Sequence, residues 1–161
     1  MLQELGISKQ DSRPQRVSSS ELGVKGEAMA AKRLEADGYR LVLSNFKVPI
    51  GRNTKGVQVT GEIDIVALDG ETLCFVEVKT RRKRDFGGPL TAVDRRKQRQ
   101  ITRTARGYRQ MFGVWAMPYR FDVVTVVLRK GEPAEIEIVK GFWSEQKFRK
   151  QRWSGDNAWS G

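Results

Sequence analysis

Two short apolar runs on either side of Asp69-Gly70 constrain the fold of this sequence more than any other feature. The runs are Gly61–Leu68 and Thr72–Thr80, and both are rich in β-branched residues. An Asp-Gly pair between two such runs is a strong signal for a tight antiparallel hairpin. The pattern therefore predicts a β-hairpin whose apolar strands contain several charged residues.

A turn at Asp69-Gly70 would place Asp64 opposite Phe75 and Glu62 opposite Glu77. Side chains alternate between the two faces of a strand. One face then carries only apolar residues: Ile63, Ile65, Ala67, Cys74, Val76 and Val78. The other face carries charged residues toward its open end: Glu62, Asp64, Glu77 and Lys79.

The charged end of this hairpin suggests a cation site. In the predicted register Asp64 and Glu77 are diagonal neighbours, with Cα atoms roughly 7–8 Å apart. Two carboxylates at that spacing can reach one cation, and without one they would repel each other. The alternatives are a solvated charged strand face and a structural Lys79–Glu62 salt bridge.

Composition removes many other chemistries. The chain has no histidine, which excludes Ser-His-Asp and Cys-His catalysis and histidine-ligated zinc. Its single cysteine, Cys74, lies in an apolar run, so we expect a buried, unreactive thiol. Hydrolytic chemistry would therefore depend on carboxylates, lysine and a hard divalent ion such as Mg²⁺ or Mn²⁺.

The chain is strongly basic, with a formal charge of +11. This excess favours a polyanionic partner, most often nucleic acid. The alternatives are a ribosome-associated protein and a merely soluble basic one. No apolar run is long enough to span a membrane, and no signal peptide precedes the domain, so a cytoplasmic location is the default expectation.

The remaining pattern predicts one domain at residues 18–144, between a disordered leader at 1–17 and a flexible tail at 145–161. A capping box predicts a first helix from Ser18 to about Asp37. The other elements are expected at Tyr39–Phe46, Thr91–Phe112, Phe121–Leu128 and Ala134–Val139, with a long loop at residues 47–60. The second helix would bury a stripe at helical spacing: Ile101, Ala105, Tyr108 and Phe112. The element order α-β-β-β-α-β-β is typical of an α/β domain with a mixed sheet flanked by helices.

With these residues in place, the sequence resembles a known family. Asp64 followed by Glu77-Val78-Lys79 is similar to the D…(D/E)xK signature of restriction-endonuclease-like nucleases. The wider pattern resembles the bacterial YraN-like family of predicted endonucleases, which is related in fold to archaeal Holliday-junction resolvases. The resemblance covers about residues 23–128 and is carried by Gly26-Glu27, Leu34, Gly38-Tyr39, Asn45, Gly61-Glu62-Ile63-Asp64, Phe75-Val76-Glu77-Val78-Lys79-Thr80-Arg81, Phe86-Gly87 and Lys97.

The resemblance implies a restriction-endonuclease-like fold and a metal-dependent endonuclease acting on nucleic acid, with DNA favoured over RNA. It adds Glu27 to the catalytic set of Asp64, Glu77 and Lys79. Mg²⁺ or Mn²⁺ would be held by Asp64 and Glu77, with help from the Val78 carbonyl and from Glu62 or Glu27. Resolution of a branched junction would favour a symmetric homodimer, although the sequence reveals no dimer interface.

Nucleic-acid binding is predicted for basic residues in the loop after Lys79 and on the second helix. Contacts of this kind would go to phosphates and give affinity rather than sequence reading. The alternative for the helix is an ordinary solvated basic surface. The residues are Arg81, Arg82, Lys83, Arg84, Arg95, Arg96, Lys97, Arg99, Arg103 and Arg106.

Overall fold

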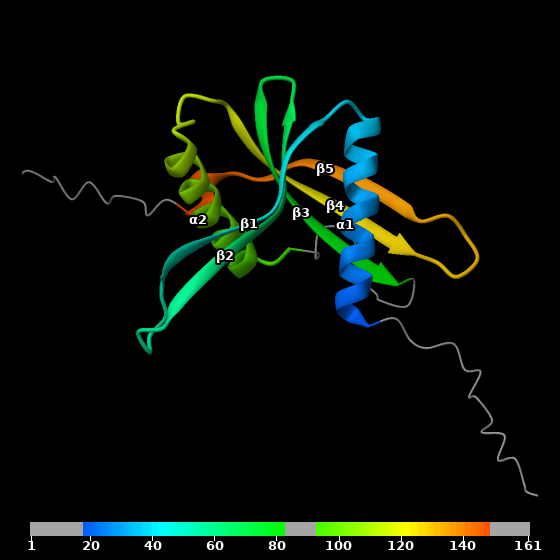
Figure 1. Ribbon diagram of the computed structural model, residues 1–161, viewed down its shortest axis with the longest axis horizontal. Helices are drawn as coiled ribbons and strands as arrows, with labels where there is room; N and C mark the ends of the chain where they lie inside the picture. Colours follow the sequence, from blue (N-terminus) through cyan, green and yellow to red (C-terminus); the bar gives the residue numbers. More distant parts are fainter. Residues whose placement is uncertain (1–17, 83–92, 149–161) are drawn as a thin grey trace, which may run out of the picture.

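The computed structural model describes residues 18–82 and 93–148, which form a mixed α/β domain (Figure 1). The order of elements is the predicted one. They are α1 (Ser19–Ala36), β1 (Arg40–Arg52), β2 (Gln58–Asp69), β3 (Thr72–Arg82), α2 (Arg95–Phe112), β4 (Tyr119–Leu128), β5 (Glu135–Trp143) and the 3₁₀ turn η2 (Glu145–Phe148).

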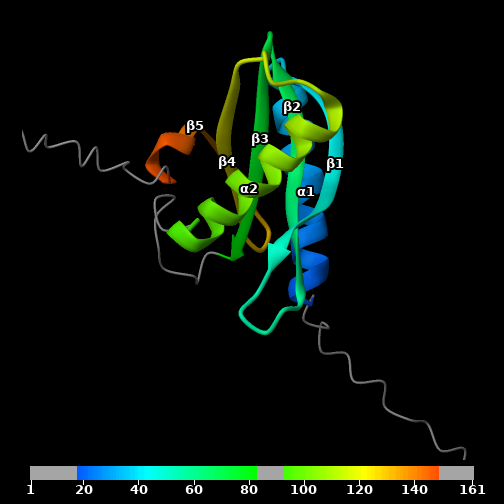
Figure 2. The same ribbon diagram turned by 90° about the vertical axis from the view of Figure 1, so that its left-hand side faces the viewer.

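A five-stranded sheet in the order β1-β2-β3-β4-β5 separates the two helices (Figures 1 and 2). Neighbouring strands are antiparallel except β3 and β4, which run parallel and are joined through α2. Each face of the sheet has its own core. Ala30 and Leu34 of α1 pack on one face, and Ile101, Ala105 and Tyr108 of α2 pack on the other.

The first helix begins as its sequence predicts. The Ser18 hydroxyl accepts a hydrogen bond from the Glu21 N–H at 3.2 Å, and the Glu21 carboxylate accepts from the Ser18 N–H at 2.9 Å. This is a complete capping box. The chain leaves the helix through Gly38, whose φ of +93° suits glycine.

The predicted loop at residues 47–60 is mostly strand. β1 continues to Arg52 and β2 begins at Gln58, and residues 53–57 form the turn between them. Pro49 and Gly51 weaken the strand pattern in the sequence. Both are accommodated at a register shift between Pro49 and Gly51, where one strand carries an extra residue.

The predicted register of the β2–β3 hairpin was wrong by two residues. Asp69 pairs with Thr72, so Gly70 and Glu71 form the turn instead of Asp69 and Gly70. Gly70 then occupies the first central position with φ of +60°, the conformation that a type II′ turn requires there. Phe75 therefore lies opposite Val66, not Asp64.

A shift of two residues leaves each side chain on its predicted face of the hairpin. Ile63 is nevertheless on the opposite face from the other residues of the predicted apolar face. Ile65 packs in the core beneath α1, whereas Ile63 packs in the core beneath α2. The β2–β3 pairs end at Ile65 and Val76, while the pairing of β2 with β1 continues to Gln58. Two-stranded ribbons twist more strongly than wide sheets, which accounts for the change of face.

Most of the predicted stripe of α2 is buried, with Tyr108 stacked edge-to-face on Phe46 and Phe75. Phe112, at the end of the stripe, is 52% exposed. The Cys74 thiol is buried, as expected. No helix in the described ranges is long and apolar enough to cross a membrane.

The chain continues past β5 into η2, which lies against α2: Lys147 Nζ donates to Gln98 Oε1 at 3.0 Å. The predicted leader, residues 1–17, and most of the predicted tail, residues 149–161, lie outside the described residues.

Candidate active site

Asp64 and Glu77 lie where β2 and β3 cease to pair. The last β2–β3 pair is Ile65 with Val76, and just beyond it the Val78 N–H donates a hydrogen bond of 2.8 Å to Asp64 Oδ2. A side-chain carboxylate thus links the two strands at this point. Asp64 is thereby fixed beside the Glu77-Val78-Lys79 segment.

Glu77 is a buried carboxyl, with only 4% of its surface exposed. Burial, followed by the charge of Asp64, raises the pKa of Glu77 to about 8, against the opposing effect of Lys97 and Lys79. Glu77 therefore keeps its proton to a higher pH than an exposed glutamate, because two carboxyls share a site with little water. A cation at this point would relieve the repulsion.

Two lysines approach Glu77 without closing tight ion pairs. Lys79 Nζ lies 3.6 Å and Lys97 Nζ 3.9 Å from Glu77 Oε1. Lys79 comes from the same strand, two residues on, whereas Lys97 comes from the first turn of α2. That turn is fixed by Asp94, whose side chain accepts from the Lys97 N–H at 2.8 Å.

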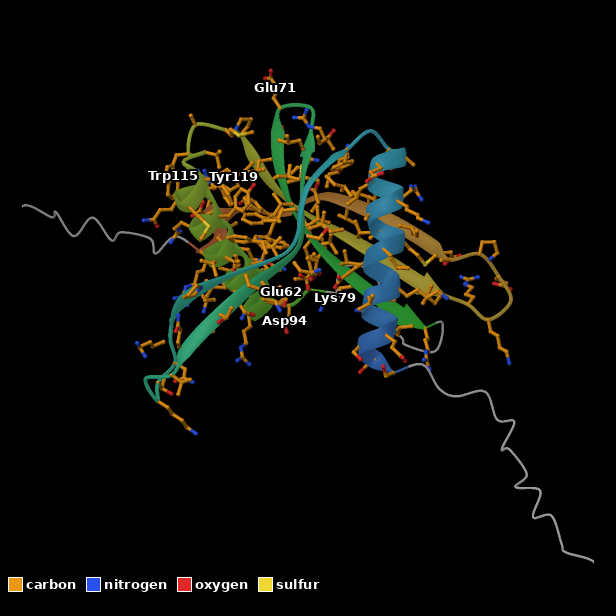
Figure 3. All side chains as sticks on the ribbon, viewed as in Figure 1. Glu62, Glu71, Lys79, Asp94, Trp115 and Tyr119 are labelled. Carbon is orange, nitrogen blue, oxygen red and sulfur yellow. The ribbon has the colours of Figure 1, made fainter. Side chains whose placement is uncertain are left out.

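Glu27 of α1 faces the same region. Burial, then the charges of Asp64 and Glu62, raise the pKa of Glu27. The helix reaches this position because residue 26 is glycine: a Cβ there would lie 1.7 Å from Thr80 Oγ1. In Figure 3, Glu62, Lys79 and Asp94 gather in the region between the N-terminal halves of the two helices.

The acidic residues do not form a ready cation cage. Within residues 18–82 and 93–148, no group of three Asp, Glu, Cys or His side chains is close enough to hold a metal ion. Even so, the donor types fit Mg²⁺ or Mn²⁺, which prefer carboxylate and carbonyl oxygens. The raised pKa of the buried Glu77 beside Asp64 also marks a place where positive charge is in deficit.

The basic residues predicted to bind nucleic acid have different environments. Arg81 and Arg82 end β3, while Lys83 and Arg84 lie outside the described residues. On α2, the guanidinium groups of Arg95 and Arg99 stand 6.0 and 5.7 Å from the centre of the Phe148 ring.

Other cations of α2 brace the fold. Arg103 donates to the carbonyl of Ile50 in β1, and Arg106 pairs with Glu145 of η2. Arg96, in contrast, is exposed and forms no hydrogen bond or ion pair with any residue in the described ranges. The helix is therefore less free to bind phosphates than its sequence suggests.

Lys97 is the residue whose position the sequence did not reveal. It was predicted to bind nucleic acid, yet its ammonium group lies beside Glu77. Lys97 is among the residues that carry the family resemblance, but its local pattern is that of one basic residue among many on a helix. The approach to Glu77 depends on how α2 crosses the sheet, which no local pattern states.

Fold and geometry together define a mixed α/β domain with a buried carboxyl pair and two lysines at the point where two strands separate. The chain belongs to the uncharacterised protein family UPF0102, whose family model matches residues 26–126. This is the YraN-like family that the sequence resembles.

Several bacterial relatives match over most of their length. A UPF0102 protein of Prosthecochloris aestuarii is 42% identical over 131 residues, which cover 78% of this chain and 95% of the relative. A UPF0102 protein of Chlorobaculum tepidum is 44% identical over 124 residues, covering 74% and 88% respectively. One of Geobacter sulfurreducens is 42% identical over 118 residues, covering 73% and 84%.

Proposed function

We propose that this protein is a metal-dependent endonuclease that hydrolyses phosphodiester bonds of nucleic acid, with DNA, including branched DNA, favoured over RNA. The observation that carries the proposal is the pair of carboxyls Asp64 and Glu77. Glu77 is buried, and its raised pKa shows that the nearby positive charge does not balance the two carboxylates. Lys79 lies two residues further along the same strand, 3.6 Å from Glu77. The net charge of +11 supports a polyanionic substrate.

Asp64 and Glu77 would hold Mg²⁺ or Mn²⁺, assisted by the Val78 carbonyl and by Glu27 or Glu62. When bound, such an ion polarises a phosphate and lowers the pKa of a water molecule. Lys79 would orient that water or neutralise charge on the phosphorane-like transition state. The Val78 N–H keeps Asp64 in place, because it already donates to one carboxylate oxygen.

A second candidate is a nucleic-acid-binding module that does not cleave, or cleaves only with a partner. The observation in its favour is that Lys79 and Lys97 approach Glu77 while no three acidic side chains in the described ranges converge on one point. In that case the lysines would serve as permanent counter-ions of Glu77.

Cleavage of a substrate panel distinguishes these functions. The panel contains a four-way junction, a flap, linear duplex, single-stranded DNA and RNA, each with Mg²⁺, Mn²⁺ or EDTA. We expect metal-dependent cleavage that falls at least about 100-fold in Asp64→Ala and in Lys79→Ala, with binding retained.

Matched variants control for purity and for loss of charge. Glu71→Gln, in the exposed hairpin turn, and Lys130→Ala, in the exposed β4–β5 turn, should cleave as the wild type does. Cleavage that persists in Asp64→Ala would refute the site. Tight binding without cleavage on every substrate would favour the second candidate.

A further inference from the structure

Beyond the candidate active site, β1 and β2 form a two-stranded arm. We call residues 47–62 the ribbon arm: its pairs run from Lys47 and Glu62 to Arg52 and Gln58. Since the β2–β3 pairs end at Ile65 and Val76, β2 pairs only with β1 in this segment. The ribbon arm projects beyond the rest of the sheet in both views (Figures 1 and 2).

The ribbon arm is braced against α2 at both ends of its paired segment. Arg103 donates to the carbonyl of Ile50, and Gly51 leaves room for that guanidinium, because a Cβ there would lie 2.6 Å from its Nη2. Close to the site, a Cβ on Gly61 would lie 2.0 Å from Thr104 Oγ1. The direction of the arm is therefore set by helix packing.

The tip of the ribbon arm is also held in one conformation. Asn53 Oδ1 accepts from the N–H groups of Lys55 and Val57 at 2.9 and 3.0 Å. Arg52 Nη1 donates to the Gly56 carbonyl at 2.8 Å. This self-bonded turn presents its side chains from a fixed backbone, which reduces the entropy lost when the arm binds a partner.

The charge of the ribbon arm is positive at the tip. Lys47 faces Glu62 across the strands, and no other acidic residue occurs in the segment. Arg52 and Lys55 are exposed at the tip, and Val57 beside them is 59% exposed. A positive tip next to an apolar side chain suits the phosphates and groove wall of a nucleic acid, the polyanion that the net charge of +11 favours as a partner.

The arm begins at the candidate active site. Its length therefore sets how far from the reacting phosphate its tip could contact a bound substrate. Asp64 to Gln58 spans six residues, or about 20 Å at roughly 3.4 Å per residue. A duplex rises about 3.4 Å per base pair, so the tip would reach about six base pairs from the reacting phosphate. The major groove is wide enough to admit a two-stranded β-ribbon.

We infer that the ribbon arm binds the flank of a duplex about six base pairs from the cleavage site, which makes duplex-flanked nucleic acid the substrate class. This inference rests on the proposed function. Lys55 contacts a phosphate of the flank, and the arm contributes nothing to single strands or to duplexes whose flank is too short.

Binding without cleavage tests the inference independently of catalysis. Dissociation constants are measured in EDTA for a duplex with long flanks, a duplex cut to about three base pairs on either side of its centre, and a single strand. Lys55→Glu is compared with Lys130→Glu, an exposed turn lysine on the β4–β5 hairpin. We expect Lys55→Glu to weaken long-duplex binding about 5–10-fold and to reduce the log–log salt slope by about 0.9.

The controls test the ribbon arm and the endonuclease activity separately. Lys130→Glu, the short duplex and the single strand should show no such change. Equal long-duplex affinity for Lys55→Glu and wild type would overturn the ribbon arm but leave the endonuclease intact. A changed oligomeric state by sedimentation, with unchanged duplex affinity, would instead assign the arm to another protein chain. A wild type that binds no nucleic acid would refute both proposals.

Discussion

Glu77 is the residue whose pKa differs most clearly from that of an ordinary glutamate. It lies beside Asp64 on a strand whose other buried residues are apolar. The Nζ atoms of Lys79 and Lys97 are 3.6 and 3.9 Å from its Oε1. Burial and the Asp64 charge together raise its pKa from 4.5 to about 8. The folded protein therefore holds a proton that the unfolded chain releases.

This shift predicts how stability depends on pH in the metal-free protein. A carboxyl with a higher pKa in the folded state stabilises fully below its unfolded pKa, and this stabilisation is lost as pH rises through the folded value. The free energy of unfolding should thus fall between about pH 4.5 and 8. Glu77→Gln should reduce this fall and be about 2 kcal/mol more stable than wild type at pH 8.

Urea unfolding at about pH 5, 6.5 and 8 measures this effect, with exposed Glu71→Gln as the control. Glu71→Gln should follow the wild-type curve. The same pH dependence in Glu77→Gln and wild type would mean that Glu77 is ionised throughout the range, and the account of its burial would be wrong.

Among the secondary-structure elements, α1 contributes to the candidate site because it packs very closely on β3. Gly23 and Gly26 both weaken the helix by propensity, by up to about 1 kcal/mol each relative to alanine. Only Gly26 has a packing reason, since a Cβ at Gly23 would meet nothing within 4 Å. Gly26 therefore sets the position of Glu27 relative to the site.

The two glycines provide a matched pair of substitutions. Gly23→Ala should leave cleavage unchanged and raise the melting temperature slightly, because alanine favours helix. Gly26→Ala should destabilise by about 1–3 kcal/mol, because its Cβ overlaps Thr80, and it should also reduce cleavage. Thermal unfolding and the cleavage assay together provide the measurement. Similar behaviour of the two variants would show that the close approach is unimportant.

In the molecule as a whole, two buried acidic groups lie on neighbouring strands and differ in how they are satisfied: Glu77 is on β3, and Asp122 is on β4 opposite Val76. Asp122 has no exposed surface. It accepts hydrogen bonds from Arg120 Nε at 2.7 Å, the Gly141 N–H at 2.9 Å and the Tyr39 hydroxyl at 3.2 Å. Its charge is fully matched, unlike that of Glu77, so we assign Asp122 to stability alone.

Removal of the Asp122 carboxylate should therefore affect folding and not the site. Asp122→Ala would leave Arg120 partly uncompensated, and we expect a loss of about 3–5 kcal/mol in the free energy of unfolding. Urea unfolding measures this, and Mn²⁺ titration of the folded variant should give the wild-type affinity. Weakened Mn²⁺ binding in a variant that is still folded would contradict the assignment of Asp122 to stability alone.

The order of elements could be predicted from the sequence because each has a local cause. Ser18 and Glu21 define a helix start, alternating apolar runs define strands, and glycine defines turns. The choice of Asp64, Glu77 and Lys79 as candidates was equally local, since charged residues inside apolar strands are unusual whatever the surroundings.

Register, helix placement and charge partners could not be predicted in this way. The two-residue shift at Gly70 depends on which turn position takes a positive φ, and the side of Ile63 depends on ribbon twist. Lys97 meets Glu77 only because α2 crosses the sheet at one angle. The sequence by itself thus determined which residue types and which elements this protein has. Tertiary structure alone decided which of them meet, because contacts between distant segments depend on packing, which local patterns do not encode.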